Sequence, residues 1–363
     1  MSAEVKREMK RNIMTAVYSA AHFFVDLACA FLMFRCIFPG SGRGEVILFY
    51  NFCAFALQMP LGALMDRLGM GHLAAAAGCL MIAAAYPLNT LAGGLTAAIV
   101  MGLGNSLFHL GGGVYVLDEF DKSGALGVFV SPGAIGLYLG TLWGSGDTLP
   151  ITFPIAAVTV CGMIIFLLPR LLRLENVRGA AAPVLPVDGN FSGNASACLS
   201  AAAMFTLVVV IRSFGGFALH PAWKTGMAAF AAVIATASGK AAGGFLSDKL
   251  GKEIVSAVTM AAAGLLFLFS DNMAAGLSGI FLFNMSMPIT LRAAADIFRD
   301  SRGFSFGLLT FALFLGYIPV YIFGNPAITG SAMCLLCLAS GILLTAGFRA
   351  ASWKRRPEGE CAD

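Results

Sequence analysis

Charged residues are scarce in this sequence. Asp, Glu, Lys and Arg together make up 12% of its 363 residues, whereas soluble globular domains carry roughly 25%. Hydrophobic residues make up 58%, and they occur in long blocks rather than at amphipathic spacing. This composition excludes an ordinary soluble enzyme and indicates a chain that lies in lipid.

Patterns that bind metals or nucleotides are also lacking. Cys334 and Cys337 have C-x-x-C spacing, but they lie in an apolar helix without a second pair or a nearby histidine, so packing is their expected role. The glycine-rich stretch 102–113 follows no strand and ends without a Lys-Ser/Thr pair, so it is not read as a phosphate loop. We therefore expect no cofactor, no metal and no nucleic-acid partner.

Twelve stretches are apolar enough to cross a bilayer, which takes about 20 residues each. They lie at roughly 13–34, 45–65, 72–90, 93–117, 124–143, 150–170, 198–219, 226–247, 254–270, 273–293, 303–323 and 327–348. The connecting loops are short except for a polar linker at 171–197. The sequence thus predicts an all-α membrane protein with two six-helix bundles, at 1–170 and 198–363.

The distribution of basic residues predicts the orientation. Of the 23 Lys and Arg residues, Arg35, Arg43 and Lys224 fall on one side of the predicted membrane, and Arg212 and Lys240 fall within spans. The other eighteen lie on the side of the N-terminus. The positive-inside rule then places both termini in the cytoplasm, and we expect a multi-pass protein of the cell (inner) membrane surrounded by lipid.

One phrase occurs in both halves of the chain. Residues 62–69 and 244–251 share the pattern G-x-L-x-D-[RK]-L-G at an offset of 182 positions, about half the length of the chain. Such duplication in an apolar chain is typical of transporters built from parallel repeats. We expect the glycines to allow close helix approach and each Asp to face a helix N-terminus, with contacts that break and reform. The matched residues are Gly62, Asp66, Arg67 and Gly69, and then Gly244, Asp248, Lys249 and Gly251.

A second pair of phrases supports the duplication. Asp118-Glu119-Phe120 ends the fourth predicted helix and Asp296-Ile297-Phe298 ends the tenth, and both precede a basic residue, a glycine and an apolar helix.

These motifs resemble the loop motif of the major facilitator superfamily, G-x-L-a-D-R-x-G-R-K. The second copy matches it more fully, because Met70-Gly71-His72 replaces the basic pair in the first. The resemblance covers nearly the whole chain. It implies a twelve-helix fold, a monomer without cofactor, and secondary active transport by alternating access.

A narrower resemblance is to the fosmidomycin-resistance branch of the superfamily, which implies efflux. It rests on four patterns and has two departures, because Leu110 replaces a proline and Ala98 replaces the arginine of drug/proton antiporters. The patterns are His22-x-x-x-Asp26, Gln58-x-Pro60, Gly102-x-Gly104-x-Ser106-x-Phe108-His109 and Arg212-Ser213-Phe214. The stretch Ser131-Pro132-Gly133 is similar to an antiporter motif, and helix packing explains it equally well.

Ionisable residues inside the predicted spans mark the candidate site, because each costs about 2.5–3.5 kcal/mol to insert. His22 and Asp26 share one helix face, which suits either a proton switch or a structural hydrogen bond. His109 either contacts substrate or bonds its own bundle. Arg212 suits an anion anchor, or an ion pair with Asp26. Lys240 is expected to extend to the cytoplasmic edge.

The sequence therefore predicts a secondary transporter for a small anionic or zwitterionic solute. We expect Arg212, His109, Phe108 and His22 to bind the solute, and Asp26 with His22 to couple proton movement to efflux. The alternatives are a facilitator or symporter in which Asp26 is structural, a membrane enzyme based on His22 and Asp26 or on His109, and a non-transporting receptor. The duplicated motif favours a transporter over an enzyme.

Overall fold

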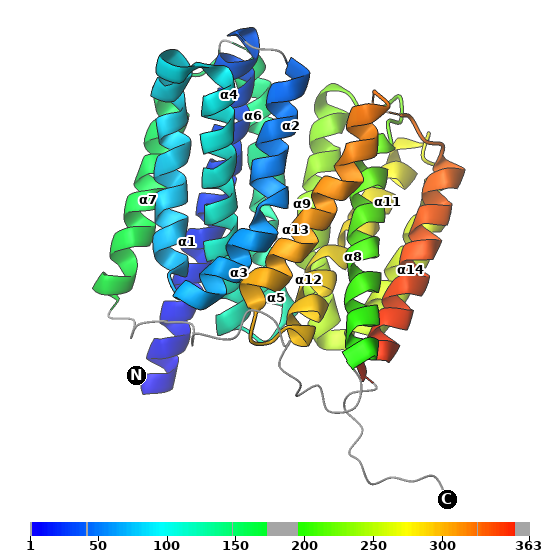
Figure 1. The fold of residues 1–363 in the computed structure, drawn as a ribbon. Coiled ribbons are helices and arrows are strands. Elements are labelled where there is room, and N and C mark those ends of the chain that lie inside the picture. The colour runs from blue at the N-terminus through cyan, green and yellow to red at the C-terminus, as the bar shows by residue number, and fades with distance from the viewer. Residues whose placement is uncertain (1, 41–42, 147, 173–194, 325, 353–363) are drawn as a thin grey trace, which may run out of the picture.

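The computed structural model describes residues 2–40, 43–146, 148–172, 195–324 and 326–352, and in these ranges all regular structure is helical. Figure 1 shows two bundles side by side, with α1–α7 in one and α8–α14 in the other. Most of the predicted linker, residues 173–194, lies outside the described part. The chain has an all-helical membrane fold, as its composition predicted.

The first bundle consists of seven α-helices and short irregular turns. Its helices are α1 (Ala3–Leu32), α2 (Arg43–Asn51), α3 (Gln58–Leu68), α4 (Gly71–Glu119), α5 (Ser123–Val130), α6 (Pro132–Ser145) and α7 (Thr152–Leu171). π-Helical turns at Met33–Ile37 and Phe52–Ala56 extend α1 and join α2 to α3, and a 3-10 turn spans Phe38–Gly40. α5 and α6 form one predicted span, which is broken where Pro132 begins a new helix.

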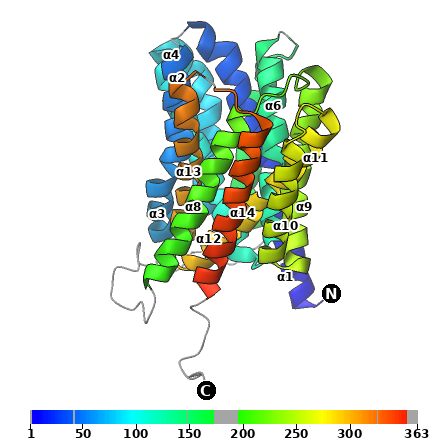
Figure 2. The same cartoon turned by 90° about the vertical axis from the view of Figure 1, so that its right-hand side faces the viewer.

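The second bundle also contains seven α-helices in the described ranges. They are α8 (Ala195–Ala218), α9 (Gly226–Leu250), α10 (Lys252–Phe267), α11 (Met273–Asn284), α12 (Ser286–Ile297), α13 (Arg302–Ile322) and α14 (Gly330–Ser352). α11 and α12 together make one predicted span, with a break at Met285. The start of α1 and the end of α14 lie at the same end of the molecule (Figures 1 and 2).

The predicted count of twelve spans is not confirmed. The described residues contain ten segments that are long and apolar enough to cross a membrane. Two predicted spans, 72–90 and 93–117, merge in the 49-residue α4, which changes direction at Gly93 (φ 83°, ψ 165°). The two arms of α4 pack together where Gly78 contacts Gly104. α10 has 16 residues, fewer than the roughly 20 that a straight crossing needs.

The first helix begins ten residues earlier than its predicted apolar span. Ser2 caps α1 by accepting a hydrogen bond from the Val5 amide at 3.3 Å. The polar residues that follow continue the helix, because a cap and good helix formers stabilise it without burial. Hydrophobicity alone marks only the part that lies in lipid.

Two helix crossings connect the bundles, and glycines make both possible. Gly62 of α3 lies against the backbone of Gly303 in α13, and Gly244 of α9 lies against Ser123 and Gly124 in α5. A side chain on Gly62 or Gly244 would collide with backbone atoms of the opposite helix. Because Gly62 and Gly244 are equivalent positions of the duplicated motif, the two crossings are related by the repeat.

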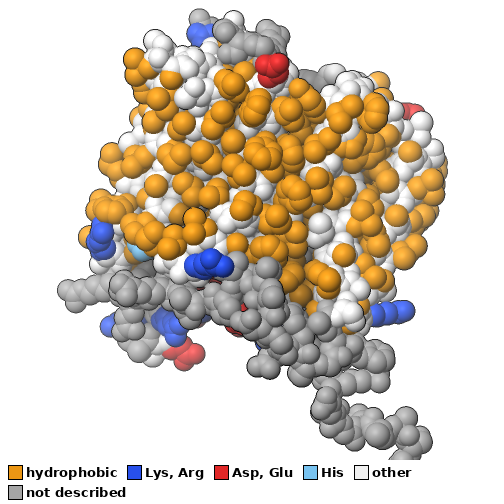
Figure 3. Space-filling model, in the orientation of Figure 1, with side chains coloured by type: hydrophobic (Ala, Val, Ile, Leu, Met, Phe, Trp, Pro, Cys, Tyr) orange, Lys and Arg blue, Asp and Glu red, His pale blue; other side chains and the backbone are white. Residues whose placement is uncertain are grey.

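The surface suits a lipid environment. Figure 3 shows hydrophobic side chains over the body of one face, with Lys and Arg near its edges. Exposed hydrophobic residues occur on many helices, for example Leu91 (82%), Leu335 (68%) and Ile342 (70%). Such a belt would be an aggregation hazard in water, and it is the expected surface of a protein in lipid.

A methyl group at the first crossing should separate the bundles. We expect Gly62→Ala to destabilise the protein by about 1–3 kcal/mol, the usual cost of overpacking, and to lower its melting temperature in detergent. Gly71→Ala is the matched control, since its added Cβ would meet its nearest neighbours at 3.7–3.9 Å, an ordinary contact distance. Equal melting temperatures for both variants would contradict this account of the crossing.

Candidate functional site

Each copy of the duplicated motif contacts a helix N-terminus in the opposite bundle. Asp66 accepts hydrogen bonds from the amides of Gly303 and Phe304 at 2.7 and 2.8 Å, where α13 begins. Asp248 accepts from the amides of Ser123 and Gly124, both at 2.8 Å, where α5 begins. The first turn of a helix has free amides and a partial positive charge, so both contacts are favourable.

The glycines that end the two motifs turn the chain. Gly69 closes α3 in the left-handed region (φ 63°), and Gly251 follows α9 with φ 92°. Both values favour glycine over residues with a side chain. Arg67 and Lys249, the basic residues of the motifs, form no ion pair with any other described residue.

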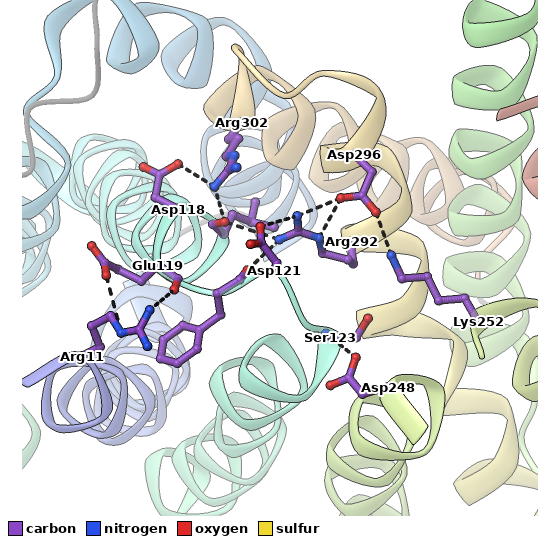
Figure 4. Close-up of polar contacts among 12 residues, drawn as sticks. Arg11, Asp118, Glu119, Asp121, Ser123, Asp248, Lys252, Arg292, Asp296 and Arg302 are labelled. Carbon is purple, nitrogen blue, oxygen red and sulfur yellow. Dashed lines mark hydrogen bonds and ion pairs between the residues drawn. The ribbon is translucent and has the colours of Figure 1, made fainter. Parts of the chain in front are cut away.

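A network of ion pairs surrounds these contacts at the same end, which we call the motif end (Figure 4). Arg302 pairs with Asp118 across the bundles at 3.1 Å. Arg292 donates to the carbonyl oxygen of Phe120 at 2.6 Å and pairs with Asp296 at 2.8 Å. The network thus links the two bundles at the motif end in this conformation. Further pairs are Lys252–Asp296 at 2.7 Å, Arg292–Asp121 at 3.4 Å and Arg11–Glu119 at 3.9 Å.

Three ionisable side chains meet inside the first bundle. His22 and Asp26 come from α1 and His109 comes from the second arm of α4. Asp26 Oδ2 lies 3.2 Å from His22 Nε2, and Asp26 Oδ1 lies 3.7 Å from His109 Nε2. The two Nε2 atoms are 2.9 Å apart. We call these three residues the His–Asp cluster.

The Nδ1 atoms of both histidines, which point away from the cluster, face backbone carbonyl oxygens. His22 Nδ1 lies 2.7 Å from the Phe129 oxygen and His109 Nδ1 lies 2.9 Å from the Asn105 oxygen. A carbonyl oxygen only accepts, so both Nδ1 atoms must carry hydrogen. In neutral rings both Nε2 atoms would then be lone-pair acceptors facing each other. Two acceptors 2.9 Å apart repel each other, so the arrangement suits a cation between them, such as a single shared proton.

The surroundings of the cluster fix its shape. Asn105 donates through Nδ2 to Asp26 Oδ1 at 3.3 Å. Gly133, in the first turn of α6, lies against His22 and Asp26 so closely that a Cβ there would collide with both side chains. The side chains of Asp26 and His109 are 19% and 12% exposed, so the cluster retains limited access.

Two basic residues of the second bundle complete the candidate site. Arg212 of α8 is 8% exposed, and one terminal nitrogen is buried without a hydrogen-bond partner. Lys240 of α9 donates to the carbonyl oxygen of Val130 at 3.2 Å, and it lies close enough to Asp26 and Arg212 to interact with both charges. In this region the described residues offer Arg212 no carboxylate partner.

The structure brings together some of the predicted residues and separates others. His22, Asp26 and His109 form one cluster, whereas Asp26 pairs with the histidines and forms no ion pair with Arg212. Phe108 is fully buried, with its ring centre 5.5 Å from that of His109. It therefore packs beneath the cluster in this conformation, out of reach of a solute.

Three residues that contact the candidate site were either missed in the sequence analysis or given another role there. Lys240 was expected to extend to the membrane edge, but it bonds α5 across the bundles. Asn105 lies inside the recognised glycine-rich pattern, next to Gly104, and could have been found there. Gly133 was noticed only as part of a packing motif. Their contacts depend on helix rotations that composition does not reveal.

Comparison with known proteins identifies the fold. No family model and no curated protein matches the sequence. Among solved structures, the chain has the fold of major facilitator superfamily transporters. It is similar to FucP, the E. coli fucose:proton symporter, in its outward conformation (TM-score 0.63, 15% identity, 96% of this chain and 100% of that one).

Two other solved structures share this fold. The human organic anion transporter MFSD10 has a TM-score of 0.69 at 14% identity, covering 92% of this chain and 99% of that one. A bacterial homologue of the iron transporter ferroportin in an outward-facing state has a TM-score of 0.58 at 14% identity, covering 94% and 100%.

A side chain at position 133 should disrupt the His–Asp cluster. Because its Cβ would collide with His22 and Asp26, we expect Gly133→Ala to abolish whatever activity depends on Asp26, as strongly as loss of Asp26 itself. Solute uptake into proteoliposomes measures this. Gly146→Ala is the control, since its Cβ would meet its neighbours at 3.6 and 3.8 Å. Wild-type activity in Gly133→Ala would show that the packing of the cluster is not needed.

Proposed function

We propose that this protein is a secondary active transporter that moves a small anionic or zwitterionic solute by alternating access. Proton binding at Asp26 and His22 drives efflux of the solute. The transporters that share the fold support the general mechanism, and the organic anion transporter MFSD10 is an example in which such a fold serves anions. The buried basic residues of the candidate site are the reason for proposing an anionic solute.

The single observation that carries this proposal is the unpartnered guanidinium of Arg212. Leaving a buried charge without its partner costs about 3–5 kcal/mol, and buried polar groups in native structures are nearly always hydrogen-bonded. Arg212 has no such partner in the described residues and has Lys240 as a neighbouring cation. An anionic group of the solute, held by the planar fork of the guanidinium, provides the missing partner.

The crossings explain how the site becomes accessible to each side. The conformation described here is held closed at the motif end by Asp66, Asp248 and the ion pairs around Arg292 and Arg302. All of these contacts are polar, and Asp66, Asp248 and Asp118 are partly exposed whereas Arg292 is buried, so the exposed members can exchange their partners for water. Release of both motif contacts lets one bundle rock against the other around the central residues.

The membrane arrangement follows from the same proposal. The two arms of α4 each cross the bilayer and α10 makes a short crossing, which gives twelve crossings. The bundles correspond to residues 1–170 and 198–363, with a cytoplasmic linker at 171–197. The motif end then faces the cytoplasm with both termini, in agreement with the excess of basic residues. The protein works as a monomer without a cofactor.

Coupling arises from the cation that the two histidines share. With one proton between the Nε2 atoms, the positive charge of the imidazole pair balances Asp26. Losing that proton leaves Asp26 unbalanced beside Lys240, which favours a rearrangement toward the basic residues of the second bundle. The solute anion and Asp26 then compete for Arg212 and Lys240, and this competition links proton release to solute movement.

The main alternative is a facilitator or symporter in which Asp26 has only a structural role. FucP, a fucose:proton symporter, shows that this fold also serves symport. The two mechanisms differ in whether neutralising Asp26 removes the dependence of transport on pH.

Anions should stabilise the protein through Arg212. We expect phosphonates, phosphates or carboxylates to raise the melting temperature of the detergent-purified protein, with about 2.7 kcal/mol of stabilisation at a hundredfold excess over Kd. Arg212→Ala should abolish this shift. Arg170→Ala is the matched control, because Arg170 lies at the end of α7 and stacks on Phe166. Stabilisation by organic cations alone, or equal shifts in Arg212→Ala, would overturn the choice of solute.

Neutralising Asp26 should uncouple transport from protons. His22, His109 and Lys240 all act on this carboxylate, so Asp26→Asn removes the charge that they balance. We expect solute-driven proton movement in proteoliposomes to fall at least tenfold, while anion stabilisation through Arg212 persists. Glu45→Gln, an exposed carboxylate of α2, should behave as wild type. Unchanged, pH-independent transport in Asp26→Asn would favour the facilitator.

A further inference from the structure

We propose that the His–Asp cluster binds a first-row divalent transition metal ion such as Zn²⁺, Co²⁺ or Ni²⁺. His22 Nε2, His109 Nε2 and one oxygen of Asp26 are the ligand atoms. The sequence predicted no metal, because the three residues come from distant parts of the chain. The proposal concerns binding at equilibrium and does not depend on transport.

The spacing of the ligand atoms suits one ion. Atoms bound to a common metal at about 2.1 Å lie about 3.0 Å apart at right angles and about 3.4 Å apart at the tetrahedral angle. In the cluster the two Nε2 atoms are 2.9 Å apart, Asp26 Oδ2 lies 3.2 Å from His22 Nε2, and Asp26 Oδ1 lies 3.7 Å from His109 Nε2. One ligand atom from each residue lies within 4.8 Å of the other two. Small shifts of the side chains would bring these atoms around a single ion.

The second shell is arranged as metal sites require. Ligand histidines usually donate their other ring nitrogen to a carbonyl or carboxylate, which fixes the tautomer and aims the lone pair at the metal. Here His22 Nδ1 faces the Phe129 oxygen and His109 Nδ1 faces the Asn105 oxygen. Asn105 also donates to Asp26. With hydrogen on Nδ1, the free lone pair of each imidazole lies on Nε2, and the two Nε2 atoms are 2.9 Å apart.

The donor set selects the class of metal. Two imidazoles and one carboxylate suit borderline ions, whereas Mg²⁺ and Ca²⁺ prefer sites made of oxygen atoms. Two of the protein's four histidines lie in this cluster. The ligand charge of −1 offsets half the charge of a divalent ion, so a further anion is favoured beside it.

The site is partly open and supplies three protein ligands. Gly133 covers the side formed by His22 and Asp26, while Asp26 and His109 retain some exposure. Sites with three protein ligands leave a coordination position for water or a second ligand, whereas closed structural sites have four. Binding should therefore be reversible. Metal and the shared proton occupy the same space between the Nε2 atoms, so one excludes the other.

Titration of the full-length protein with Co²⁺ tests this proposal. After treatment with a chelator, detergent-purified protein should bind one equivalent of Co²⁺ with visible d–d absorption of nitrogen and oxygen ligation, and excess Zn²⁺ should displace it. Mg²⁺ and Ca²⁺ should not. We expect His22→Gln and His109→Gln each to weaken binding at least about tenfold. His72→Gln is the control, because His72 lies near the start of α4.

Several outcomes would overturn the proposal. They are no stoichiometric Co²⁺ binding, equal affinity in both cluster variants and wild type, or a thiolate charge-transfer band that assigns the metal to cysteines. Melting curves without metal establish that the variants are folded, and His109→Asn is a second, smaller replacement if His109→Gln is unstable. Arg212→Ala should retain Co²⁺ binding while losing anion stabilisation, so the metal site and the proposed transport function can fail separately.

Discussion

The cost of placing charge in an apolar, lipid-facing body governs this structure. Each ionisable side chain inside it must find a partner or a solute, because isolated charges are expensive there. Asp26 is surrounded by two histidines and an amide, and Lys240 bonds a backbone carbonyl. Arg212 has no partner of this kind among the described residues. The candidate site is therefore where the pairing of buried charges is incomplete.

The same constraint explains the motif end. The carboxylates of the duplicated motif make their contacts between the bundles at one end, and they accept hydrogen bonds from helix N-termini. These amides lack partners within their own helices, so Asp66 and Asp248 satisfy them without disturbing the helices. The glycines of the motif bring the helices close enough for this contact. The two reciprocal contacts link the bundles at the end of the molecule where both motif copies lie.

Sequence predicted the parts of the molecule that depend on local pattern. Long apolar runs located the membrane segments, and the duplicated phrase predicted that its glycines pack closely and that each Asp faces a helix N-terminus, whereas only the structure shows that these contacts join the bundles. The pattern did not reveal that Gly93 reverses the chain within α4 or that α10 is short. Hydrophobic length alone does not report where a helix bends or ends.

The site was predictable only in its residue types. The spacing of His22 and Asp26 on one helix face follows from helix geometry. The approach of His109, the contact of Gly133 and the reach of Lys240 depend on how separate helices rotate and pack. Such tertiary contacts are not encoded in spacing along the chain, so the close approach of the two histidine Nε2 atoms emerged only from the structure.

The most direct test of alternating access is to measure distances at both ends of one molecule. Spin labels at positions 68 and 250 report on the motif end, and labels at 91 and 227 report on the opposite end. The native residues there are exposed by 53%, 58%, 82% and 80%. Double electron–electron resonance measures the distance within each pair of labels, in a variant without native cysteines. Each pair should show a short and a long distance. When pH or an added anion changes, the share of the short distance should rise at one end and fall at the other. One fixed distance at both ends under all conditions would contradict the account.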